Sequence, residues 1–147
     1  MTNESLTLIL LDTNVVSEIF KATADENVIL WIASCKPSEL ATSVITITEL
    51  RFGAICHPDK TKGATLHGQI SEFLQSLNVD NLLTFDLAAT EICAKLMAES
   101  RAFTPREKLA DLQIAAIAMS RNIPIATRNI RDFRHKGLEI VNPWATP

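Results

Sequence analysis

The sequence has 147 residues, of which 47% are hydrophobic and 21% are charged, a composition typical of a globular protein with a buried core. No apolar run is long enough to cross a bilayer, and the opening residues lack the basic and apolar pattern of a targeting signal. We therefore expect one domain over residues 1–147, in the cytoplasm and without membrane contact. The three cysteines are far apart, which fits buried thiols of a reducing compartment.

The net charge of −3 is unevenly distributed along the chain. Residues 1–94 carry 5 Lys and Arg against 12 Asp and Glu, whereas residues 95–147 carry 9 against 5. The basic C-terminal part could face a polyanion such as nucleic acid. Solvated helix faces explain charges of this kind equally well, so the charge pattern alone leaves both interpretations open.

Apolar runs and helical spacings alternate along the chain. The runs typical of buried strands are 6–11, 40–45, 82–85, 123–126 and 138–141. The stretches with helical character begin near residue 14, cover 25–35, begin again at 46–49, and then cover 66–77, 87–103 and 109–119. Strands that alternate with helices pair in parallel through right-handed crossovers. The sequence therefore predicts an α/β domain with three layers, α/β/α.

Acidic side chains follow two of the predicted strands. Asp12 stands at the carboxyl end of the first strand. Glu49 ends the segment Thr46-Ile47-Thr48-Glu49, which spells a capping box and marks the start of the helix after the second strand. The functional crevice of an open parallel sheet lies beyond the carboxyl ends of its strands. We therefore expect both carboxylates at one rim of the sheet.

Further polar residues come from the C-terminal part. Asp111 lies at the start of the apolar helix 109–119, and Asn129 and Asp132 follow the fourth strand. Each acid of the chain taken alone also has a structural explanation, as a helix cap, a first-turn acid or a turn residue. Several carboxylates in one crevice repel one another unless a cation joins them. Oxygen ligands suit Mg²⁺ or Mn²⁺, and such ions commonly serve phosphodiester chemistry.

Four motifs and a terminal segment occur in order from about Ile9 to Trp144. They read Leu-Leu-Asp12-Thr13-Asn14-Val-Val-Ser-Glu, Ile-Thr-Glu49-Leu-Arg-Phe-Gly, Ala-Asp111-Leu-Gln-Ile-Ala-Ala-Ile-Ala, Ala-Thr127-Arg128-Asn129-Ile-Arg-Asp132-Phe133 and Val141-Asn142-Pro143-Trp144. This series resembles the PIN-domain ribonucleases, and most closely the VapC and FitB branch, which are toxins of type II toxin-antitoxin systems. The resemblance implies a five-stranded parallel sheet flanked by helices.

The resemblance also implies roles for particular residues. Asp12 and Asp111 match the most dependable metal ligands of the family, Glu49 matches the third acid, and the fourth ligand falls on Asp132 or Asn129. The amide of Asn129 can coordinate through its oxygen or orient a water, but it brings no charge. Thr13, Asn14 and Thr127 can aim the carboxylates through hydrogen bonds.

The function implied is Mg²⁺- or Mn²⁺-dependent hydrolysis of RNA phosphodiester bonds by an endoribonuclease toxin. A cognate small antitoxin protein and a homodimer, with higher assembly on the antitoxin, are the partners that the resemblance implies. Three arginines lie near the predicted rim and could bind the RNA backbone: Arg128, Arg131 and Arg134. They could equally be solvent-exposed loop residues with no binding role. The alternative is a catalytically silent module that binds RNA or a protein, and Asn129 is the residue that favours it.

Overall fold

The computed structural model describes residues 7–100, 109–134 and 137–146. These contain one sheet of five strands, all parallel, in the order β3-β2-β1-β4-β5. The strands are β1 (Ile9–Leu11), β2 (Leu40–Ser43), β3 (Leu82–Leu83), β4 (Ile125–Ala126) and β5 (Ile140–Val141). In the central strand, Leu10 pairs with Ala41 of β2 on one side and with Ile125 of β4 on the other. The predicted five-stranded α/β fold is confirmed.

Helices connect the strands along the described chain. They are α1 (Thr13–Ile19), α2 (Glu26–Ser34), α3 (Val44–Ile55), α4 (Lys60–Ser76), α5 (Leu87–Ser100), α6 (Leu109–Arg121) and the short α7 (Ile130–Phe133). Two 3-10 turns, Pro37–Glu39 and Val79–Asn81, precede β2 and β3. No helix of the described residues is long and apolar enough to span a membrane.

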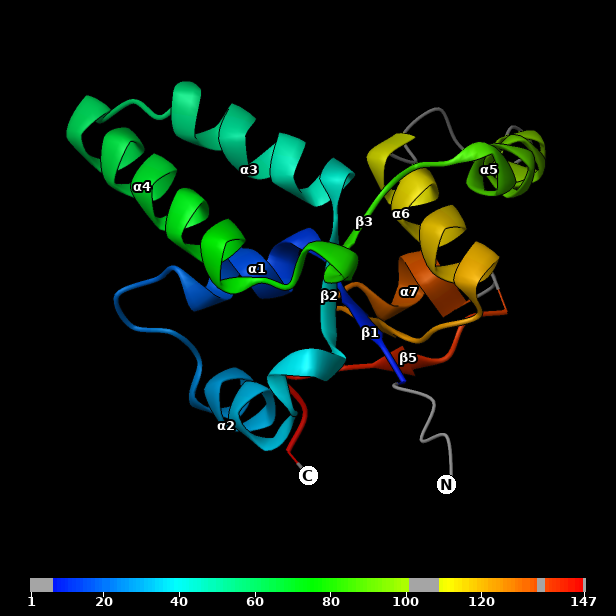
Figure 1. Cartoon of the computed structure of the whole chain (residues 1–147), viewed down its shortest axis with the longest axis horizontal. Coiled ribbons are helices and arrows are strands. Elements are labelled where there is room, and N and C mark those ends of the chain that lie inside the picture. Colours follow the sequence, from blue (N-terminus) through cyan, green and yellow to red (C-terminus); the bar gives the residue numbers. More distant parts are fainter. Residues whose placement is uncertain (1–6, 101–108, 135–136, 147) are drawn as a thin grey trace.

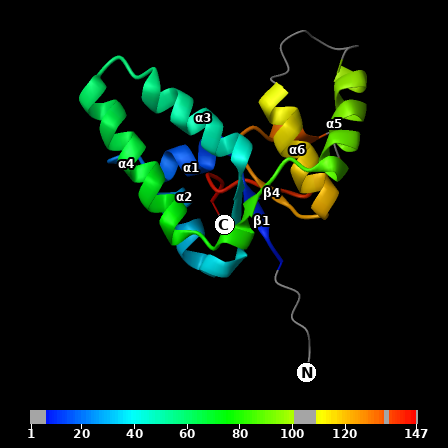
Figure 2. The ribbon, with the colours of Figure 1, turned by 45° about the horizontal axis from the view of Figure 1, so that its top comes forward.

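The helices cover both faces of the sheet, which gives the three predicted layers (Figures 1 and 2). On one face, Leu10 and Ile125 pack with α5, the apolar side of α6 and Phe133 of α7. On the other, Leu11 and Ala126 pack with residues of α1, α2, α3 and α4. Neighbouring strand residues point to opposite faces, so both faces of the central strands must be apolar. This explains the continuous apolar runs in the sequence.

Several predicted boundaries differ from the structure. The strands are shorter than their apolar runs, because the backbone leaves the sheet before the apolar residues end; Val44 and Ile45, for example, already belong to α3. α4 begins at Lys60, six residues before the predicted 66–77, with Asp59 as its N-cap. The predicted end of the helix 87–103 lies outside the described residues. Cys56 is exposed rather than buried.

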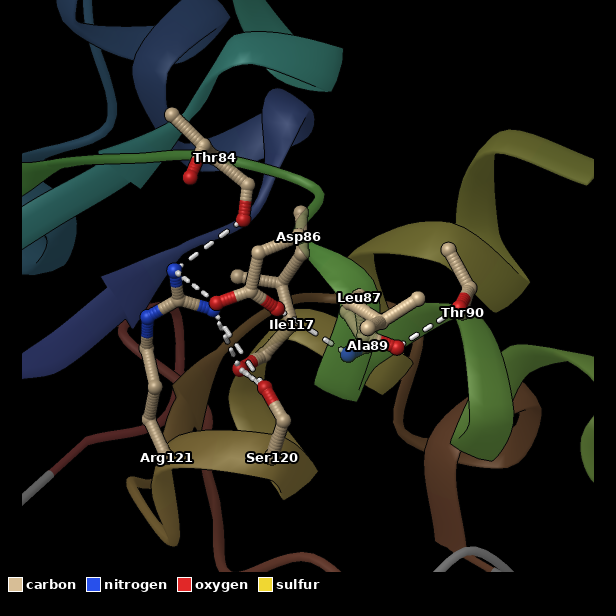
Figure 3. A network of polar contacts seen from close by, with 8 residues as sticks. All are labelled: Thr84, Asp86, Leu87, Ala89, Thr90, Ile117, Ser120 and Arg121. Carbon is tan, nitrogen blue, oxygen red and sulfur yellow. Dashed lines mark hydrogen bonds and ion pairs between the residues drawn. The ribbon is translucent and has the colours of Figure 1, made fainter.

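The C-terminal end of α6 is anchored by Arg121 (Figure 3). Its guanidinium donates hydrogen bonds to the carbonyls of Thr84, at 3.0 Å, and Ile117, at 3.3 Å. It also lies 3.6 Å from a carboxylate oxygen of Asp86, whose other oxygen accepts the N–H of Ala89 and so caps α5. Asp86 is therefore the N-cap of α5. This network joins the end of α6 to the beginning of α5 and fixes the direction of the helix that carries Asp111.

Candidate active site

Asp12 links the central strand to the first helix and is only 2% exposed. One carboxylate oxygen accepts the backbone N–H of Thr13 at 2.8 Å, which makes Asp12 the N-cap of α1. The other accepts the hydroxyl of Thr127 at 2.8 Å, from the end of β4. The capping role and the placement at the strand ends are therefore both present in one side chain.

The surroundings of Asp12 disfavour its negative charge. Burial is the main cause, and it raises the pKa of the Asp12 carboxyl above the ordinary value of 3.8. The hydrogen bonds from Thr127 and Thr13 oppose this shift, while the charges of Glu49 and Asp132 raise the pKa further. Three of the predicted acids are thus near enough to interact electrostatically.

Glu49 joins this region from the second turn of α3. The hydroxyl of Thr13 donates to its carboxylate at 2.7 Å, and the same hydroxyl lies 3.1 Å from that of Thr46. The predicted capping box is wrong: Ser43 is the N-cap, its hydroxyl accepting the N–H of Thr46, so the helix starts three residues earlier. Glu49 therefore stays available to face Thr13 instead of bonding its own helix terminus.

Asp111 is half-buried in the first turn of α6, as the sequence predicts. α6 packs against α3, and the two helices begin side by side in both views (Figures 1 and 2). The fold thus brings the helix that carries Asp111 beside the helix that carries Glu49.

The loop after β4 is organised around the hydroxyl of Thr127. This hydroxyl donates to Asp12 and accepts the backbone N–H of Asn129 at 3.0 Å and the side-chain amide of Asn14 at 3.4 Å. Thr127 is fully buried, whereas the side chain of Asn129 caps nothing in α7 and is exposed. Thr127 thus connects Asn14 and Asn129 to the Asp12 carboxylate, and the orienting roles of Thr127 and Asn14 stay predictions. Asp132 is exposed in α7, near enough to act on the pKa of Asp12.

The three predicted RNA-contacting arginines are all exposed. Arg131 lies in α7 and Arg134 at its end. Arg128 differs from them, because its guanidinium carbon lies 5.2 Å from the centroid of the Trp144 ring. A guanidinium at this distance over an indole makes a cation–π contact.

A shared ligand set is not assembled in the described part of the chain. Within residues 7–100, 109–134 and 137–146, no group of three or more His, Cys, Asp or Glu side chains is arranged to hold a metal ion. The hydrogen bonds that Asp12 and Glu49 accept from the described residues come from hydroxyls and a backbone N–H. Neither acid forms an ion pair with a described Lys or Arg. The carboxylate oxygens of Asp12 and Glu49 are ligands that suit a hard divalent cation.

A family model for the PIN domain matches residues 9–138. The chain belongs to the PIN-domain family. This PIN domain is 36% identical over 137 residues to the plasmid stability protein StbB of Pseudomonas syringae pv. tomato, covering 93% of this chain and 99% of that protein. It is also 36% identical to the VapC ribonuclease Y4jK of Sinorhizobium fredii, covering 93% and 98%. Toxin FitB of Neisseria gonorrhoeae is 31% identical, covering 93% and 99%.

Solved structures of the FitB system agree with the fold. The PIN domain superposes on a chain of the crystal structure of FitAcB from Neisseria gonorrhoeae with a TM-score of 0.83 and 30% identity, covering 95% of this chain and 100% of that one. A structure of FitAB bound to an IR36 DNA fragment gives a TM-score of 0.83 at 29% identity, covering 95% and 98%. The resemblance stated from the motifs is thereby confirmed.

Sequence reasoning missed two features of this PIN domain. Ser43 and Thr46 form a hydroxyl pair that supports Thr13 from the start of α3. A serine directly after an apolar strand was the available signal, since serine is a favoured N-cap. The contact of Arg128 with Trp144 had no such signal, because it joins two loops 16 residues apart.

Proposed function

We propose that this PIN domain is a metal-dependent endoribonuclease that hydrolyses RNA phosphodiester bonds, acting in the cytoplasm as the toxin of a type II toxin-antitoxin module. The observation that carries the proposal is the Asp12 carboxylate, which is buried at the strand ends and, among the described residues, accepts hydrogen bonds only from neutral donors. The charges of Glu49 and Asp132 raise its pKa. Capping of α1 uses one oxygen of Asp12 and does not explain why this buried acid lies within electrostatic reach of two others. A cation bound between these acids would offset the electrostatic cost of ionising the buried Asp12.

We assign the cation, Mg²⁺ or Mn²⁺, to Asp12, Glu49, Asp111 and Asp132. When bound, such an ion acidifies a water molecule and neutralises charge that develops on the scissile phosphate. The chain's own residues orient the carboxylates: Thr127 holds one oxygen of Asp12, and Thr13 holds Glu49. Asn129 and Asn14 in turn fix Thr127 from two sides. This is the kind of surrounding hydrogen bonding that sets ligand direction in metal sites.

The partners we propose are a small antitoxin protein and a second copy of the chain. Support comes from the relative named toxin FitB and from the solved assembly of FitAB with DNA. Co-expression with the product of a short upstream reading frame tests this: we expect a stable complex on size exclusion and no ribonuclease activity in it. A monomer with unchanged activity would contradict the proposed partnership.

The decisive experiment uses purified protein and total cellular RNA with Mg²⁺ or Mn²⁺, with and without EDTA, followed by mapping of the new RNA ends. We expect cleavage at defined positions that EDTA abolishes and that Asp111→Asn loses. Tight RNA binding without turnover would instead support a silent binding module, the alternative favoured by the neutral Asn129. Cleavage that persists in EDTA would contradict metal dependence.

A further inference from the structure

Arg128 is placed by the same bonds that hold Asp12. It follows Thr127 directly, and its backbone N–H donates to the side-chain oxygen of Asn14 at 3.4 Å. Asn14 bonds the Thr127 hydroxyl, which donates to the Asp12 carboxylate. The backbone of Arg128 is thus connected to the buried acid through two side chains.

The Arg128 guanidinium is oriented by an aromatic ring. The guanidinium carbon lies over the Trp144 ring, 5.2 Å from the ring centroid. A cation–π contact uses the charge of the guanidinium and not its N–H groups, which can still donate hydrogen bonds. No hydrogen bond or ion pair of this side chain is formed with the described residues. Arg121, by contrast, uses its N–H groups on carbonyls and Asp86 within the protein (Figure 3).

Trp144 is itself held in place. Its backbone N–H donates to the side chain of Asn142 at 3.1 Å, and its carbonyl accepts the side-chain amide of Asn27 at 3.0 Å. The ring is half-buried against the core cluster that contains Leu11 and Val15. The indole is therefore a fixed platform and not a mobile terminal side chain.

The charge of Arg128 helps to lower the pKa of the Glu18 carboxyl, but the hydrogen bonds of Glu18 are made with other groups. Its carboxylate pairs with the ammonium of Lys21 at 2.6 Å and accepts the backbone N–H of Asp25 at 3.0 Å. The positive charge of Arg128 is therefore left for an anion from outside the described protein.

We propose that Arg128, held over the ring of Trp144, binds a backbone phosphate of the RNA, with Trp144 as its positioning residue. The inference rests on the proposed ribonuclease function, because Arg128 directly follows Thr127, whose hydroxyl donates to Asp12. The acids around Asp12 repel the phosphates on either side of the cleavage point, and a preoriented guanidinium offsets that repulsion.

The test measures binding of a fluorescein-labelled single-stranded RNA of mixed sequence by anisotropy in EDTA, so that binding is separated from cleavage. Arg128→Gln should weaken binding about tenfold. It should also reduce the slope of log affinity against log salt by about 0.7, the value for one lost phosphate contact on a single strand. Lys95→Gln, which removes one exposed charge from α5, is the matched control and should leave both quantities unchanged.

Variants of Trp144 separate the effect of positioning the Arg128 side chain from the effect of its charge. Trp144→Leu keeps the arginine, so the salt slope should remain while affinity falls about threefold, the size of an exposed cation–π contact. Trp144→Phe should recover most of the affinity, and Arg128→Lys should keep the slope with weaker binding. If Trp144→Leu does not fold, the comparison of Trp144→Phe with Arg128→Gln still decides.

The possible outcomes separate this inference from the proposed function. An unchanged slope in Arg128→Gln, in a wild-type protein that binds and cleaves RNA, overturns the inference alone. A wild-type protein that neither binds nor cleaves RNA overturns the proposed function and this inference with it. Unchanged RNA binding combined with lost binding of an acidic protein partner would assign Arg128 to that partner and reject the RNA contact.

Discussion

Charged side chains are paired with opposite charges at the end of α6, but within the described part of the chain the acids Asp12 and Glu49 at the strand ends are not. At the end of α6, Arg121 and Asp86 pair with each other and with backbone groups, so the charges are compensated inside the protein (Figure 3). At the strand ends, Asp12 and Glu49 accept hydrogen bonds only from neutral donors of the described chain. The negative charge of Glu49 also disfavours the ionised form of Asp12 and so raises its pKa. The first arrangement serves stability. The second costs stability, which is the pattern expected where a site is kept for chemistry.

Neutralising Asp12 should have the largest effect on activity. Asp12→Asn keeps the size of the side chain and an oxygen for the N–H of Thr13, but it removes one carboxylate from the proposed cation site. We expect RNA cleavage to fall by about 10³-fold or more, a loss comparable to removing a principal catalytic group. Initial rates at saturating Mg²⁺ measure this, and Lys95→Gln serves as the control. A rate within twofold of wild type would assign Asp12 to capping alone.

Breaking the compensated region should instead affect stability. Arg121→Ala removes the donors to Thr84 and Ile117 and leaves Asp86 without its ion-pair partner. We expect the free energy of unfolding to fall by about 2 kcal/mol, because hydrogen bonds of a charged group are lost and their acceptors remain. Urea titration provides the value. If activity were lost at full stability, Arg121 would belong to the chemistry instead.

Glu18 offers a second compensated acid, with an opposite pH dependence from that of Asp12. The hydrogen bond from Lys21, followed by that from Asp25, lowers the pKa of the Glu18 carboxyl below its ordinary value of 4.5. Its contribution is therefore present above pH 4.5 and is lost as the pH falls through the folded-state pKa. Glu18→Gln should lose about 1 kcal/mol at pH 7 and nothing at low pH. Urea midpoints across this range check it, and a constant difference would contradict it.

Asp12 should show the reverse sign in the absence of metal. Its pKa is raised by burial, so the folded state binds the proton more tightly and wild-type stability falls as the pH rises from 3.8 through the folded-state pKa. Asp12→Asn does not titrate, so in EDTA it should be more stable at pH 7 by up to about 1 kcal/mol. The gain should vanish below pH 3.8. A variant that is less stable at pH 7 would show that the ionised carboxylate stabilises the fold.

The sequence predicted most of what depends on local pattern. Apolar runs predicted all five strands, and Asp12 and Asp111 lie at the predicted strand end and helix start. The predicted start of the helix after the second strand was wrong because more than one residue there can act as an N-cap. Thr46 and Glu49 spell a capping box, yet Ser43 takes the cap because it already stands at the strand end.

Contacts between loops were beyond sequence reasoning. Two such contacts are the cation–π contact of Arg128 with Trp144 and the hydrogen bond from Asn27 to the Trp144 carbonyl. They depend on where the loops after the paired strands β4 and β5 lie relative to α2. No periodicity encodes such a meeting. The relative orientation of the acidic side chains is likewise a property of their rotamers, which the order of motifs does not determine.

The most direct test of the central claim is a titration of the metal-free protein with Mn²⁺, followed by the electron paramagnetic resonance signal of the free ion. If the charges at the strand ends are kept for a cation, the wild type binds Mn²⁺ saturably and Asp12→Asn binds it much more weakly, while Arg121→Ala binds it normally. Equal binding by wild type and Asp12→Asn, or no binding by either, would contradict this explanation of the buried acid.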